Sequence, residues 1–73
     1  MSYSIESLLQ IAEAGGSVDT VGGSYSKESL VKLARVIGAH GSTLIVGGSY
    51  AKESLIEIVK AGHGGKVIVK AKP

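Results

Sequence analysis

The chain of 73 residues contains no cysteine, no phenylalanine and no tryptophan, and it has a single proline. The lack of cysteine excludes a disulfide-stabilised scaffold and a thiolate metal site. No uninterrupted apolar run approaches the roughly 18 residues that a membrane-spanning helix needs. The first residues, Met1–Glu6, show no basic stretch followed by an apolar stretch, so we expect no secretory signal. These absences predict a cytoplasmic protein without a membrane partner.

The chain also has little excess of charge of either sign. Eight basic and six acidic residues leave a net charge of +2, which is too weak a balance to predict a nucleic-acid partner. The hydrophobic fraction of 44% excludes a disordered, highly charged tail. With three tyrosines as the only aromatic residues, leucine, isoleucine and valine must supply the core. This length and composition predict one domain, residues 1–73.

The chain contains a threefold internal repeat. A block with the pattern Ser-Tyr-Ser/Ala followed by Glu-Ser-Leu begins at Ser2, recurs at Ser24 and recurs again at Ser49, at offsets of 22 and 25 residues. An apolar-periodic stretch, a glycine cluster and a β-branched run follow each block. Periods of this length are typical of repeat architectures, in which each repeat is one supersecondary unit. The chain therefore divides into a first, a second and a third unit: about residues 2–23, 24–48 and 49–73.

Each unit is predicted to begin with a helix. In the second unit, apolar residues at positions i, i+3, i+4 and i+7 lie on one helical face: Leu30, Leu33, Ala34 and Ile37. A serine is expected to cap the start of each helix, because its side-chain oxygen can accept a hydrogen bond from a first-turn amide. These predicted N-caps are Ser2, Ser24 and Ser49. A glycine is expected to end each helix. These are Gly15, Gly38 and Gly62.

Each unit is predicted to end with a short strand, at Val18–Val21, Thr43–Val46 and Lys66–Lys70. A strand joined to the next by a helix makes a right-handed crossover, which requires parallel pairing. Short connections then favour an α/β fold with strand order 1-2-3 and all helices on one face of the sheet, a short α/β solenoid. Alternation along the strands predicts that Ile45 and Ile68 lie on the other face, with Thr20 beside them.

In unit length and layer plan, the whole chain resembles the leucine-rich-repeat horseshoe. The strand signature LxxLxLxxN of that family is absent here. The resemblance therefore implies the layer plan and no binding residues.

The two ends of such a stack predict self-assembly. Terminal repeats normally carry polar caps, yet the third strand is as apolar as the second. A second copy docking head to tail would supply the missing neighbour, in a ring or a filament. Main-chain hydrogen bonds are expected to supply much of the attachment, and a proline at Ile68 should block it if that amide faces the partner. The predicted interface consists of edge-strand residues and two residues of the first helix: Val18, Thr20, Val21, Lys66, Val67, Ile68, Val69, Lys70, Leu9 and Ile11.

Two other functions remain open. The Gly-Gly-Ser turns stand between a strand and a helix start, where free amides favour a phosphate-type anion. Neither turn has a Walker A or GxGxxG pattern, so a small-molecule ligand is less expected than turn chemistry. The residues of this alternative site are Gly22, Gly23, Ser24, Gly47, Gly48 and Ser49. The other alternative is a protein-interaction module of the immunity or antitoxin kind, which the sequence neither supports nor excludes.

No enzyme, cofactor or metal is predicted. His40 and His63 occupy equivalent glycine turns, but Asp19 is the only aspartate and no cysteine exists to complete a metal site. No nucleophile, base and orienting group are grouped together, which indicates a non-enzymatic protein.

The three tyrosines, Tyr3, Tyr25 and Tyr50, recur at the unit offset and predict a ladder from unit to unit. We expect this ladder to be structural, with its hydroxyls in water, because no basic groove accompanies it.

Overall fold

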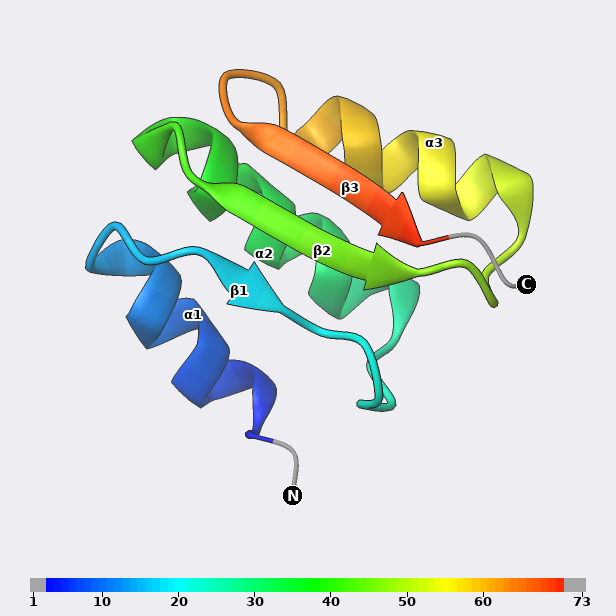
Figure 1. Ribbon diagram of the computed structural model, residues 1–73, viewed down its shortest axis with the longest axis horizontal. Coiled ribbons are helices and arrows are strands. Elements are labelled where there is room, and N and C mark those ends of the chain that lie inside the picture. Colours follow the sequence, from blue (N-terminus) through cyan, green and yellow to red (C-terminus); the bar gives the residue numbers. More distant parts are fainter. Residues whose placement is uncertain (1–2, 71–73) are drawn as a thin grey trace.

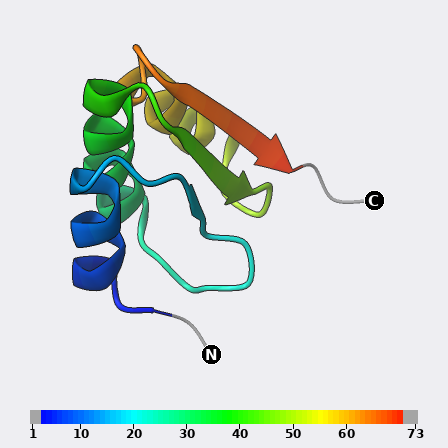
Figure 2. The ribbon, with the colours of Figure 1, turned by 60° about the vertical axis from the view of Figure 1, so that its left-hand side comes forward.

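The computed structural model describes residues 3–70. Three helices alternate with three strands: α1 (Ile5–Glu13), β1 (Val18–Asp19), α2 (Lys27–His40), β2 (Thr43–Gly47), α3 (Lys52–Ala61) and β3 (Lys66–Lys70). The strands form one parallel sheet in the order β1-β2-β3. The helices lie side by side in a second layer on one face of that sheet (Figures 1 and 2). The predicted α/β class, strand order and parallel pairing are confirmed.

The core lies between the two layers and is centred on the second unit. The four residues predicted to form the inner face of α2, Leu30, Leu33, Ala34 and Ile37, are all fully buried. They are buried because α2 packs against α1 on one side and α3 on the other. Other elements complete the core with Leu8, Ala12, Val18, Leu44, Val46 and Ile58.

The helices begin two residues later than predicted. In α1 and α2 the second serine of the repeated block, Ser4 or Ser26, accepts a hydrogen bond from the amide three residues on. The equivalent residue before α3 is Ala51, which has no side-chain acceptor. The predicted caps are therefore wrong in the second and third units: Ser24 and Ser49. Ser2 lies outside the described residues. The reason is the tyrosine between the two positions, which reaches back to the preceding unit and so keeps the chain extended before the helix starts.

The helix ends agree with prediction in the first and third units. Gly15 follows the last residues of α1 with a φ of 93°, and Gly62 caps α3. Gly38 was predicted to end α2 but lies inside it, and the left-handed Gly41 is the cap. Gly38 is small for another reason: a β-carbon there would lie 2.6 Å from the His63 carbonyl oxygen. The absent side chain lets the turn after α3 approach α2.

The register of β1 differs by one residue from the repeat in the sequence. The repeat in the sequence aligns Val21 with Val46. The sheet instead pairs Val18 with Leu44, so the residue level with Val46 is Thr20, one residue before Val21. Between β2 and β3 the sheet pairs Val46 with Val69, as the sequence pattern suggests. β1 is also two residues long rather than four.

This shift turns Thr20 into the core. Because successive side chains of a strand alternate, a slip of one residue exchanges the two faces. Thr20 is only 6% exposed, and its Oγ1 donates to the Ile45 carbonyl oxygen at 2.8 Å. The prediction that it lies beside Ile45 on the open face is therefore wrong. Asp19 takes the solvent-facing position, which suits a carboxylate that has no buried partner.

Candidate functional site

The candidate site consists of the two lateral ends of the layered structure, which Figure 1 shows on opposite sides of the molecule. We call them the α1/β1 end and the α3/β3 end, after the elements that form them. At each end the gap between the helix layer and the sheet layer is hollow. Inside the molecule, the inward side chains of α2 and β2 are fully buried between the neighbouring units.

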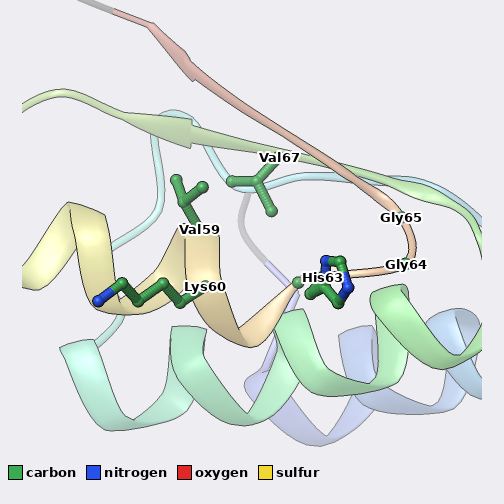
Figure 3. A pocket seen from close by; sticks show the side chains of 7 residues that line it. Val59, Lys60, His63, Gly64, Gly65 and Val67 are labelled. Atoms are coloured by element: carbon green, nitrogen blue, oxygen red, sulfur yellow. The ribbon is translucent and has the colours of Figure 1, made fainter.

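The hollow at the α3/β3 end is lined by two valines, a lysine, a histidine and glycines. Val59 of α3 and Val67 of β3 line it from opposite layers, together with Lys60, His63 and the glycines of the turn that joins the two elements (Figure 3). Val59 lies at the position in the repeat that Ala34 holds in α2, where Ala34 is fully buried. Val59 is nevertheless 43% exposed, because no further helix packs beyond α3 in the described chain. This end therefore leaves an apolar side chain uncovered.

The hollow at the α1/β1 end is lined by Tyr3, Ile11 and Asp19, among others. Ile11 is 40% exposed, as its place in the predicted interface requires. Leu9 was predicted to belong to the same interface. It is half-buried and packs against the core, so Ile11 alone of this pair is left for an outside contact.

The outer strand β3 has its edge amides at the odd-numbered residues. The Lys66 amide donates to the Ser42 carbonyl oxygen on the β2 side at 2.9 Å. Because peptide groups point alternately to the two edges of a strand, the Ile68 amide also faces β2, while the Val67 and Val69 amides face outward. A proline at Ile68 would therefore break the sheet itself, and the amide that tests an outside contact is that of Val69.

The side chains of β3 alternate in the same way. Lys66, Ile68 and Lys70 are exposed on the open face of the sheet, whereas Val67 and Val69 are half-buried toward the helices.

The edge of β1 offers less main chain than expected. The Thr20 amide donates to Ile45 of β2, so the peptide of Asp19 faces outward. The exposed Val21 lies beyond the strand, and its amide already donates to the Asp19 carboxylate at 2.9 Å. Only about one residue of β1 is thus free to pair, and side chains must supply most of any contact at this end.

The tyrosines form the predicted ladder between units. The Tyr25 hydroxyl donates to the Tyr3 carbonyl oxygen, and the Tyr50 hydroxyl donates to the Tyr25 carbonyl oxygen, both at 2.6 Å. Both hydroxyls thus bond to main chain, whereas we expected them to lie in water. The Tyr25 bond is itself exposed, and the Tyr50 bond is partly buried. Tyr3 differs, since its side chain is 67% exposed at the α1/β1 end. The ladder thus ends on a tyrosine without a preceding unit in the described chain.

The Gly-Gly-Ser turns do not coincide with the helix starts. The α2 helix begins after Ser26, and α3 begins after Ala51, so both turns precede the first helical residue by at least two positions. The Gly23 amide donates within its own turn to the Thr20 carbonyl oxygen, and the Tyr25 ring covers Gly23. The sequence argument for an anion site at Gly22–Ser24 and at residues 47–49 assumed free helix amides at these positions, and the structure places those amides elsewhere.

The two histidines do not come together with other metal ligands. His40 is the last residue of α2 and is exposed, and His63 lies in the turn after α3. Across residues 3–70 there is no group of three or more His, Asp or Glu side chains that could hold a metal ion. Over the same residues, every helix is too short or too polar to cross a membrane.

Comparison with known proteins gives no family for this chain. No protein-family model, no curated protein and no solved structure matches it significantly.

Proposed function

We propose that this protein is a non-enzymatic module that assembles with copies of itself, the α3/β3 end of one copy docking on the α1/β1 end of the next. One observation carries the proposal: both ends leave the space between the two layers hollow and expose an apolar side chain there, Val59 at one end and Ile11 at the other. The ends lie on opposite sides of the molecule (Figure 1), so a copy placed in the same orientation would continue both layers.

The internal contacts support this arrangement, because they show what a neighbour does to the same positions. The α2 helix has a helix on each side, and its inner face is fully buried. The equivalent residues of α3 have a neighbour on one side only, and Val59 remains exposed. Covering such a side chain stabilises an association by about 25 cal/mol for each Å² of apolar surface removed from water.

Main-chain hydrogen bonds contribute a smaller part of the proposed contact between copies. With Asp19 of the next copy opposite Ile68, the Asp19 amide would donate to the Val67 carbonyl oxygen, and the Val69 amide would donate to the Asp19 carbonyl oxygen. Two such bonds continue the parallel sheet. The contact joins two different surfaces and therefore builds either a closed ring or an open filament.

The proposal is tested by the molar mass in solution over a concentration series, together with electron microscopy of the largest species. We expect the mass to rise with concentration. Val69→Pro removes an outward amide without removing a bond of the β2–β3 pair, and it should lower the mass. Val69→Ala is the matched control, because it shortens the same side chain but keeps the amide. Circular dichroism establishes that both variants are folded.

A monomer at every concentration would contradict the proposal and would favour the protein-interaction alternative. A folded Val69→Pro variant that assembles like the unchanged protein would show that the edge of β3 is not part of the contact.

A further inference from the structure

The charges of the chain are separated between its two ends. The first unit, residues 2–23, contains three acidic residues and no basic one. The third unit, residues 49–73, contains five lysines and two glutamates. The side chains of the first unit thus carry a net charge of −3 and those of the third unit +3, although the whole chain carries only +2.

Some of these charges lie at the surfaces that would meet. Asp19 lines the hollow at the α1/β1 end. Lys60 lines the hollow at the α3/β3 end, and Lys66 and Lys70 are exposed on β3, the outermost strand of that end. The two ends therefore offer opposite charge to a partner.

The pleat of the sheet determines where Asp19 of a second copy would lie. Val18 faces the helices, and so do Val67 and Val69, so a continued sheet must place Val18 beside one of these two valines. Asp19 then stands on the open face, where β3 presents Lys66, Ile68 and Lys70. Every register that keeps the apolar side chains on the core side thus sets the carboxylate directly or diagonally beside a lysine.

The tyrosine ladder gives the same direction of stacking. Within the molecule, the hydroxyls of Tyr25 and Tyr50 each donate to the tyrosine carbonyl oxygen of the preceding unit. In a head-to-tail stack, the unit before Tyr3 is the third unit of another copy. The corresponding acceptor is the Tyr50 carbonyl oxygen of that copy, and Tyr3 is exposed at the end where it would dock.

We infer that the partner of the basic α3/β3 end is the acidic α1/β1 end of a second copy, with Asp19 beside Lys66 or Lys70 and with the Tyr3 hydroxyl on Tyr50 of the preceding copy. This inference rests on the proposed self-assembly and adds the polarity and the register of the contact. Two α3/β3 ends facing each other would place lysines against lysines, and two α1/β1 ends would place carboxylates together. Like charges across an interface are costly, so the charge pattern opposes both symmetric pairings.

A pair of charge-reversed variants tests the inference. Asp19→Lys makes the α1/β1 end more basic, and the double variant Lys66→Glu, Lys70→Glu makes the α3/β3 end more acidic. Each variant alone then presents like charges at its own contact. We expect the concentration for half-maximal assembly to rise about tenfold or more for each. In an equimolar mixture the two altered ends are complementary, and so are the two unaltered ends. The mixture should therefore assemble, with the two variants alternating.

Asp19→Asn is the matched control for the first variant. The amide oxygen of asparagine can still accept the hydrogen bond from the Val21 amide, so this variant removes the charge while keeping the local turn. It should weaken assembly less than Asp19→Lys. Assembly of the unchanged protein should also weaken as sodium chloride is raised, because salt screens contacts between charged surfaces.

The outcomes separate the inference from the proposal on which it rests. If the unchanged protein assembles and the variants assemble equally well alone, or if their mixture stays as dissociated as each variant, the inferred polarity is wrong and self-assembly stands. If the unchanged protein is monomeric at every concentration, self-assembly fails and the inference fails with it.

Discussion

Ala51 occupies the N-cap position of α3, where the other two helices have a serine. Its backbone is extended like that of Ser26, with a φ of −61° and a ψ of 150°, so the position has the geometry of a cap but lacks the side-chain acceptor. A serine there would accept a hydrogen bond from the amide of Ser54, as Ser26 accepts one from Ser29. One atom thus distinguishes the start of α3 from the starts of α1 and α2.

We expect Ala51→Ser to raise the free energy of unfolding by about 0.5–1 kcal/mol, because an N-cap serine satisfies one first-turn amide. Ser26→Ala is the matched control and should lower the free energy of unfolding by a similar amount. Urea denaturation monitored by circular dichroism measures both. A stabilising effect of Ser26→Ala would show that the observed bond from the Ser29 amide does not cap α2.

Between elements, the second and third units approach each other closely where their glycines meet. A β-carbon at Gly64 would lie 2.7 Å from the Gly38 carbonyl oxygen, and Gly64 has a φ of 104°. Gly22 has a similar φ of 93°, but no atom lies within 4 Å of a β-carbon there. The two positions therefore separate the cost of backbone strain from the cost of a steric clash.

We expect Gly22→Ala to lower the free energy of unfolding by about 1–2 kcal/mol, the cost of a left-handed backbone for an L-residue. Gly64→Ala should cost clearly more, because the Gly38 carbonyl must also move. Thermal and urea denaturation of both variants give the comparison. Equal losses would mean that the turn after α3 shifts away from α2 without cost.

The element level also shows which parts of the fold can be predicted from sequence. The inner face of α2 was predictable because its 3.6-residue periodicity is strong and both of its neighbours are helices of the same kind. The register of β1 was not, because the repeat aligns Val21 with Val46, whereas burial selects Val18 and Thr20. In a strand of only two residues, the burial of side chains in the core determines the register, and the sequence similarity between units does not.

At the scale of the whole molecule, the predicted strand order identified both edge strands. It did not identify which amides and side chains at these edges are available for an outside contact. Periodicity cannot show that the Ile68 amide bonds within the sheet or that Leu9 packs inward, since both depend on the neighbours that each element meets. The separation of charge between the ends is visible in the sequence once the units are counted one by one. The strand order and the parallel register are needed to show that the acidic and the basic unit lie at opposite ends of the stack.

The tyrosine ladder distinguishes contacts within a copy from contacts between copies. Tyr25→Phe removes a hydroxyl that donates inside the molecule, so it should lower the free energy of unfolding by about 0.5–1.5 kcal/mol. Tyr3→Phe removes the equivalent hydroxyl at the exposed α1/β1 end. It should leave unfolding of the single chain unchanged and should weaken assembly by about two- to tenfold, which is the same hydrogen bond expressed as an equilibrium constant.

Sedimentation measures the effect of Tyr3→Phe on assembly, and urea denaturation at a concentration below assembly measures the effect on the single chain. If Tyr3→Phe destabilises the single chain and leaves assembly unchanged, its hydroxyl acts within the copy and the ladder does not continue into the next one. If assembly weakens while the single chain keeps its stability, the contact that joins units within the molecule also joins the molecules to each other.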